Sequence, residues 1–562
     1  MIMNRMYRMI QYILVATLLI FLVACDGGNE HVEETPFETK FEAAENIFDS
    51  IPLKILIHSA KYTDYGIENS NSELFSESCM LNLEGQISKE CEDRFGFPIE
   101  FFSIKRAGQI ERNDYRLFFE SGEIADLIFP TKINPSFDHQ FFWMDEFVDN
   151  GYYKDLTPYL STYCPDVYLN MQRYDYIREM ITRDDKIYAL YAGVPDISSM
   201  VLQVKNELLT ASNMQYIHNF DELFAFMEAM NQEEEPDENN RILVSYHYLL
   251  EYAFIKAGYY PLAYNNTIIG NDIVFKVDDP ECKPYFIEDT NILDVFFEEF
   301  LPFFKKSYFL YHGKTVGDLV MDHKLNYLST YIDANIRLTD NFFSNTYFNI
   351  LYDGNVGHAM NDYSMFLFDA ESIIVDSINS ILLIPVPKTS TQPEKALSFV
   401  NWLFTDEDVG QLLTFGTDKG KYPGYKTTSD GKITYEQNTH TVYLLDNLLA
   451  NFSDRLFPFD NKSMDQSKDY IALAQKAIYP PLYRFLETNH NENMRSFELM
   501  GMSYYNNLVM KQREEYINSS IRLLFEDPKA VTAHEMKTTL DSMTDKDTAL
   551  RNYKDFVEKL FR

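Results

Sequence analysis

Three short stretches decide the fold: Pro52-Leu-Lys-Ile-Leu-Ile-His58, Pro98-Ile-Glu-Phe-Phe-Ser-Ile104 and Ala125-Asp-Leu-Ile-Phe-Pro130. Each is an apolar run bounded by residues that favour turns, which is typical of a buried strand. Between them, residues 79–95 and 115–122 have helical apolar spacing and each ends at a glycine. This β-α-β-α-β alternation predicts an α/β fold with a parallel sheet and helices on both faces.

Length and composition indicate a globular protein with a substantial core. The 562 residues are 46% apolar and 24% charged, enough for about three or four domains or two large ones. The net charge of −37 repels phosphate backbones, so we expect no nucleic-acid partner. Aromatic residues reach 15%, which suits a protein that presents flat rings as well as burying them.

The N-terminus has the pattern of an exported lipoprotein. Arg5 and Arg8 precede an apolar stretch, 12–23, that is shorter than the ~20 residues needed to span a bilayer. Leu22-Val23-Ala24-Cys25 resembles the bacterial lipobox, whose cysteine thiol accepts a diacylglyceryl group. We therefore expect a signal peptide over 1–24 and lipidation of Cys25. The alternative is a membrane anchor with an incidental cysteine.

Metal and catalytic chemistry have no clear motif in the sequence. Of the other cysteines, Cys79 and Cys91 lie on one predicted helix, about 18 Å apart along its axis, too far for a disulfide. We expect these two, Cys164 and Cys282 to be small buried hydrophobes. The 11 histidines form no zinc motif. We expect no metal, no cofactor and no catalytic residue.

A series of short motifs follows the lipobox and the strand at 52–58 along the chain. These segments are Ala125–Phe129, Asp149–Tyr159, Asp185–Leu190, Val204–Leu209, Asn219–Leu223, Gly354–Met360, Pro393–Phe399 and Phe415–Tyr422. In these motifs and their order, the chain resembles the extracellular solute-binding lipoproteins of bacterial ABC importers, of the carbohydrate type with a maltose-binding-protein-like fold. Asp185 departs from the family's glycine, and the segment between Pro385 and Pro393 is shorter than usual.

The resemblance implies a periplasmic-binding-protein-like fold of type II: two α/β lobes with hinge crossings and a helical C-terminal region. Ligand would bind between the lobes, which close on it. Hinge candidates are 193–195 and 388–393. The expected organisation is a signal peptide at 1–24, a flexible acidic tether at 25–50, a first lobe at 51–192 plus about 340–388, and a second lobe at 193–339 plus about 389–562.

Candidate ligand-binding residues are aromatic platforms and polar side chains near predicted strand ends. Each group has a structural alternative: a solvated loop, a core or surface position for Trp143, and a helix N-cap for Asn361 and Asp362. Trp402, on the apolar face of its helix, is expected in the core. The candidates are Ser59, Tyr62, Asp64, Tyr65, Thr131, Asn134, Trp143, Tyr191, Asn361, Asp362 and Tyr363.

The function implied is capture of a small solute, expected to be an oligosaccharide, and its delivery to an ABC permease. The protein would be a monomer, anchored by lipid to the outer leaflet of the cytoplasmic membrane. A surface glycan-docking lipoprotein and a ligand-sensing receptor subunit remain alternatives. A tethered glycoside hydrolase is a further one, but no motif singles out the pair of carboxylates it needs.

Overall fold

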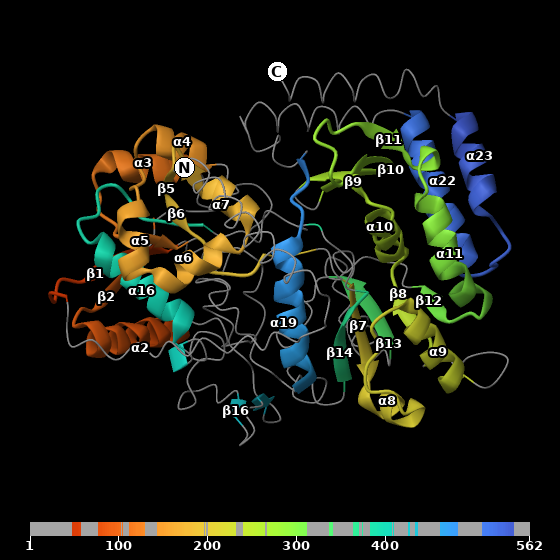
Figure 1. Ribbon diagram of the computed structural model, residues 1–562, viewed down its shortest axis with the longest axis horizontal. Coiled ribbons are helices and arrows are strands. Elements are labelled where there is room, and N and C mark those ends of the chain that lie inside the picture. Colours follow the sequence, from red (N-terminus) through yellow and green to blue (C-terminus); the bar gives the residue numbers. More distant parts are fainter. Residues whose placement is uncertain are drawn as a thin grey trace, which may run out of the picture. The chain divides into compact units, whose positions relative to one another are not determined.

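The computed structural model (Figure 1) describes eighteen parts of the chain, which fall in one compact unit starting at Asn46. These parts are residues 48–57, 77–102, 104, 112–129, 143–195, 197, 200–231, 240–264, 267–311, 336–340, 363–369, 374, 383–406, 408–409, 425–427, 433–435, 461–481 and 508–543. None of the helices in these parts is long and apolar enough to cross a membrane. The predicted signal peptide, Cys25 and most of the tether lie outside them.

The first sheet is parallel, as the sequence predicts. Its order is β2-β1-β3, formed by β1 (Leu53–Ile57), β2 (Ile99–Phe102) and β3 (Leu127–Phe129). Helices α2 (Glu77–Phe95) and α3 (Arg112–Ser121) connect these strands (Figure 1). Gly96 has φ +83° directly after α2, a conformation that glycine adopts at little cost and that ends the helix. The α/β fold class is confirmed.

A group of short helices and strands extends this first core. They are α4 (Trp143–Asp149), α5 (Thr157–Tyr163), α6 (Pro165–Gln172), α7 (Asp175–Ile181), β4 (Thr182–Arg183), β5 (Lys186–Ile187), β6 (Ala189–Leu190), β15 (Ile384–Pro385) and α16 (Pro393–Thr405). β15 pairs with β6, and α16 packs against α5 and α6 (Figure 1). Trp402 on α16 is buried, which confirms its predicted core position.

The second sheet has five strands in the order β12-β8-β13-β7-β14. They are β7 (Met200–Lys205), β8 (Ile242–Val244), β12 (Phe309–Tyr311), β13 (Ile336–Asp340) and β14 (Tyr363–Phe368). β8, β12 and β13 are parallel, whereas β7 runs antiparallel to both of its neighbours. The core that packs against this five-stranded sheet includes side chains of α8 (Asn206–Ser212), α9 (Phe220–Met230), α10 (Tyr246–Lys256) and α11 (Ile292–Lys305).

A third, antiparallel sheet and the C-terminal helices complete the described chain. The sheet is β11-β10-β9, from β9 (Tyr259–Tyr264), β10 (Thr267–Lys276) and β11 (Pro284–Phe286), followed by the 3-10 helix η6 (Ile287–Asp289). The later elements are β16 (Tyr425–Thr427), β17 (Ile433–Tyr435), α19 (Asn461–Lys476), α22 (Leu508–Leu524) and α23 (Ala533–Met543). The Phe- and Tyr-rich sequence of 241–350 predicts mostly helices, but the described part of this range contains β8 to β13 beside α10 and α11, so that prediction is wrong.

Two elements pair differently from the expected lobe boundaries, which stay a prediction. β14, expected with the first lobe, hydrogen-bonds to β7 of the five-stranded sheet. α16, expected with the second lobe, packs on α5 and α6. The candidate hinge at 388–393 lies between β15, which pairs with β6, and α16. Asp126, the residue before β3, accepts hydrogen bonds from Ser390 and Gln392 and fixes this loop.

Buried cysteines behave as predicted. Cys91, Cys164 and Cys282 are free thiols, and each is fully buried. Burial raises the pKa of Cys282 to about 12 and raises the pKa of Cys91 and Cys164 as well. These thiols therefore stay protonated and unreactive at neutral pH. Cys79 lies on α2, but its side chain is outside the described part.

Candidate functional site

The most informative site in the described chain is the connection between β6 and β7. We call residues 191–197 the crossing segment; the structure describes all of them except position 196. Its described residues are all buried. Because β6 belongs to the first core and β7 to the five-stranded sheet, this segment links the two. Residues 193–195, one of the two hinge candidates that the resemblance implies, lie within this segment.

One end of the crossing segment is held by α6. The Nδ2 of Asn170 donates to the carbonyl oxygens of Tyr191, at 3.4 Å, and of Gly193, at 3.0 Å. The backbone N–H of Tyr191 points to the Sδ of Met171 at 3.2 Å. Asn170 is itself 1% exposed, so these contacts form away from water, where hydrogen bonds are most directional and most costly to lose.

The other end is held by α19. The backbone N–H of Ile197 donates to the phenolic oxygen of Tyr470 at 2.9 Å, and that hydroxyl in turn reaches the carbonyl oxygen of Pro195 at 3.4 Å. Tyr470 is fully buried. One hydroxyl thus serves as acceptor and donor to two positions of the same segment, although it comes from a helix more than 270 residues later.

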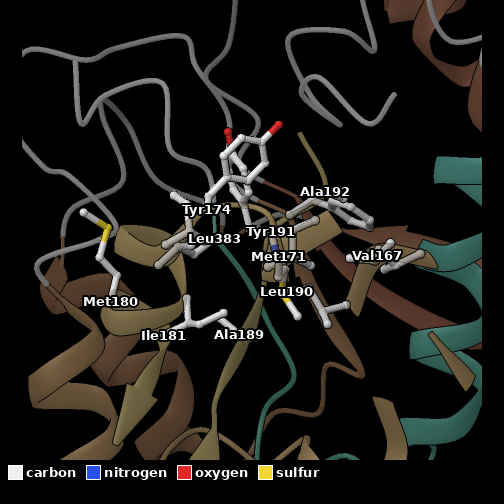
Figure 2. Close-up of a cluster of buried hydrophobic side chains, with 14 of the residues drawn as sticks. Val167, Met171, Tyr174, Met180, Ile181, Ala189, Leu190, Tyr191, Ala192 and Leu383 are labelled. Atoms are coloured by element: carbon white, nitrogen blue, oxygen red, sulfur yellow. The ribbon is translucent and has the colours of Figure 1, made fainter. Parts of the chain in front are cut away.

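Tyrosine rings gather around the start of the crossing segment. Tyr191 meets Tyr174 edge-on, with ring centroids 6.3 Å apart, and Tyr176 stacks on Tyr479 at 6.0 Å. All four rings are buried. Figure 2 shows the hydroxyls of Tyr174 and Tyr191 at the same end of the cluster, pointing away from Met171, Leu190 and Ile181. Phenols in this arrangement join an apolar body to a polar tip, which suits a boundary between core and ligand.

The predicted residue Tyr191 thus lies at this connection, but its ring is only 2% exposed. In this conformation the ring packs in the core, and its contribution to ligand binding stays a prediction. Trp143 is the first residue of α4, the helix that ends just before Gly151, and its side chain lies outside the described part, so its role in ligand binding stays a prediction.

The loops after the first and third strands also remain predictions. Ile57 and Phe129 are paired neighbours at the carboxyl edge of the parallel sheet, so the two candidate loops begin side by side. The candidates themselves lie outside the described residues; they are Ser59, Tyr62, Asp64, Tyr65, Thr131 and Asn134.

Of the third candidate group, Asn361, Asp362 and Tyr363, the structure describes only Tyr363, which begins β14 opposite Lys205 at the end of β7. The carboxyl ends of β8, β12 and β13 lie at the other edge, where Asp340 pairs with Met200. The structure does not bring Tyr363 to that edge. Asn361 and Asp362, with the predicted strand at 356–360, lie outside the described residues.

A cluster that the sequence did not reveal lies at the carboxyl edge of β8 and β12. Tyr246 directly follows Ser245 after β8, and its ring lies 6.0 Å from that of Tyr311. The Arg522 guanidinium carbon lies 5.1 Å from the Tyr246 ring centroid, and its Nη2 donates to the phenolic oxygen at 3.1 Å. Burial raises the pKa of Tyr246 although Arg522 opposes it. Since Arg522 is 276 residues away in sequence, no local signal could have found this cluster.

Metal binding has no support in the described part, which holds no cluster of three or more metal-ligating side chains. The buried charges instead pair with one another. Arg513 on α22 donates to Asp272 at 2.9 Å and to Glu288 at 2.8 Å. This triad joins α22 to β10 and η6 and has a structural role.

No family model and no curated protein matches the chain. Among solved structures, an N-glycan transport solute-binding protein from Streptococcus pneumoniae is 13% identical with a TM-score of 0.47, covering 91% of this chain and 99% of its own. The GacH receptor of Streptomyces glaucescens, studied with acarbose, is 11% identical with a TM-score of 0.40, covering 90% and 99%.

A sugar transporter from Rhizobium etli in an open conformation is also similar. It is 12% identical with a TM-score of 0.41, covering 86% of this chain and 100% of its own. With identities and TM-scores this low, the α/β class of the present chain rests on its own strand order and pairing.

Proposed function

We propose that this chain is an extracytoplasmic solute-binding protein that captures a carbohydrate and delivers it to an ABC permease. The observation that carries the proposal is the buried crossing segment, which joins one parallel sheet, β2-β1-β3, to a second sheet with parallel strands β12-β8-β13. Two α/β bodies joined by a short connection can close on a solute without any covalent chemistry. The ordered sequence motifs support the same class.

The domain organisation proposed here follows the strand pairing. The first body takes β1 to β6 together with β15 and α16, and the second takes β7 to β14 with α22 and α23. In both, ligands are expected at the carboxyl ends of the parallel strands. A carbohydrate suits such edges because aromatic faces cover its apolar sides while amides and carboxylates bind its hydroxyls.

Thermal unfolding of the full-length, detergent-solubilised protein against a panel of saccharides tests the function. A ligand at 100 times its Kd should stabilise the protein by about 2.7 kcal/mol. A response to oligosaccharides, with unchanged saccharide recovered afterwards, would support capture. No response to any sugar together with a clear shift for a peptide or polyol would overturn the carbohydrate class, and release of new reducing ends would favour the hydrolase.

Lipid anchoring is a separate part of the proposal. It rests on the lipobox at Leu22–Cys25 and on the acidic segment that follows. Cells expressing the Cys25→Ala variant should no longer incorporate labelled palmitate into the protein, whereas Cys79→Ser should incorporate it normally. Equal labelling of both variants would contradict lipidation at Cys25. Genetic proximity to a permease or to a membrane kinase would separate transport from sensing.

A further inference from the structure

The crossing segment has an unusual hydrogen-bonding arrangement. Its backbone is held by two side chains that come from distant helices, Asn170 on α6 and Tyr470 on α19. Asn170 contacts the carbonyls of residues 191 and 193, while Tyr470 contacts the backbone of residues 195 and 197. Between these two attachments lie Val194 and the backbone around it, where a change in φ and ψ would reorient everything that follows.

Within the described part, the side-chain hydrogen bonds of Asn170 both go to the crossing segment. Its Oδ1 is buried and accepts no hydrogen bond from any described residue. A buried polar atom without a partner raises the free energy of the conformation that contains it. The amide holds the segment through two hydrogen bonds, but its buried Oδ1 raises the free energy of this conformation. The free-energy difference between this conformation and others of the segment is therefore smaller.

Tyr470 also connects the segment to the surrounding helices. Its helix, α19, packs against β14 of the five-stranded sheet. Just beyond α19, Ile478 forms a parallel bridge with Ile374, and Tyr479 stacks on Tyr176 of α7. The neighbours of α19 and of the residues just after it therefore come from both the five-stranded sheet and α7.

We infer that Asn170 and Tyr470 are positioning residues for domain closure: they fix the two ends of the crossing segment and so set the balance between conformations on which solute affinity depends. This inference rests on the proposed binding function only for its affinity readout. Neither side chain needs to touch the solute, since a change in the fraction of binding-competent protein alone changes the apparent Kd.

The test compares Tyr470→Phe and Asn170→Leu with the control Tyr153→Phe, which removes a buried phenol hydroxyl from the first core. Fluorophores on unnatural amino acids at the exposed positions Glu90 and Asp221 report the distance between α2 and α9, leaving the native cysteines unmodified. Single-molecule energy transfer on the full chain gives the populations without any ligand.

Each variant removes two hydrogen bonds to the segment, and loss of even one neutral hydrogen bond should change the ratio of conformations about two- to tenfold. We expect Tyr470→Phe and Asn170→Leu to change this ratio and to shift the apparent Kd for any responding saccharide by the factor that the populations predict. Faster amide exchange at Ile197 in Tyr470→Phe would mark the lost bond. Tyr153→Phe should leave the populations and the Kd unchanged.

Unchanged populations in the well-folded Tyr470→Phe variant would overturn the inference, as would a change in Kd without a change in populations. Thermal unfolding shows whether each variant is folded. If Asn170→Leu does not fold, the milder Tyr470→Phe variant decides the outcome. Because the populations are measured without ligand, a saccharide panel that gives no response would overturn the proposed function and leave this test standing.

Discussion

The guanidinium of Arg513 on α22 donates to the carboxylate of Asp272 on β10, 2.9 Å away, and both side chains are completely buried. Arg513 also donates to Glu288 and to the carbonyl oxygen of Leu540, and its guanidinium carbon lies 4.4 Å from the Phe286 ring centroid. Burial alone would lower the pKa of Arg513, but the two carboxylates outweigh it and raise the pKa. This triad fixes the C-terminal helices to the antiparallel sheet.

Replacing Arg513 should be severely destabilising. Arg513→Met leaves two buried carboxylates without their cation, and we expect the free energy of unfolding to fall by about 3–5 kcal/mol in denaturant titrations. The control is Arg522→Met on the same helix, an exposed arginine whose loss should cost about 1 kcal/mol or less. Equal losses in the two variants would show that the triad adds nothing beyond helix packing.

Replacement of either of two glutamates, Glu514 and Glu222, should change the stability at pH 7, and the two changes should have opposite signs. Burial, and then Asp272, raise the pKa of Glu514 above its usual 4.5, so this group favours the folded state below pH 4.5, and the benefit is lost as pH rises. Glu514→Gln should therefore increase stability at pH 7 and change it little in acid. Equilibrium unfolding at several pH values measures this.

Glu222 should contribute to stability with the opposite pH dependence. Burial acts to raise its pKa, but hydrogen bonds from the backbone and ring of His218 lower it below 4.5 overall. Its contribution is present above pH 4.5 and is lost as pH falls through the lowered pKa. Glu222→Gln should therefore reduce stability at pH 7. Shifts of the same sign in both variants would contradict the assignment.

Asp126 should be the residue that holds the 388–392 loop to the first sheet. Its carboxylate accepts hydrogen bonds from the Lys54 backbone N–H at 3.0 Å, Ser390 Oγ at 2.7 Å and Gln392 Nε2 at 3.1 Å. Asp126→Ala should cost about 2–4 kcal/mol, because it leaves these donors without an acceptor. The rate of backbone amide hydrogen exchange over 386–392 should also increase in this variant. Asp155→Ala, which removes one exposed contact, is the control, and it should leave this exchange unchanged.

Trp402 provides a spectroscopic test of the first core. It is 4% exposed, and its Nε1 donates to Asp406 at 3.1 Å. In a Trp143→Phe variant it is the one remaining tryptophan of the two in the chain. We expect blue-shifted emission that acrylamide quenches poorly until the protein unfolds. Emission typical of a hydrated indole in the native state would place Trp402 outside the core.

The first sheet was predictable because its signals are local. Each apolar run between turn-forming residues became a strand, and Gly96 ended its helix. Prediction failed at β10, where Ile273, Val274 and Phe275 are all fully buried. With both faces covered, the strand lacks the alternation that would distinguish it from a helix.

The candidate site was predictable only in part. Tyr191 lies in the segment between β6 and β7, but its contribution to ligand binding remains a prediction, as do the loops after β1 and β3. Tyr470, Arg522 and Arg513 were missed because their contacts are made with residues more than 200 positions away. A lone tyrosine or arginine on a helix gives no sign of such a partner.

The order of synthesis gives the Arg513 triad a further consequence. Asp272 and Glu288 leave the ribosome 241 and 225 residues before the cation that neutralises them. Until then, burying the two acids is unfavourable, so the antiparallel sheet stays unfinished. If the chain is exported as we propose, we expect this delay to keep this part of the polypeptide unfolded, and so able to pass through a translocation channel, until α22 has been made.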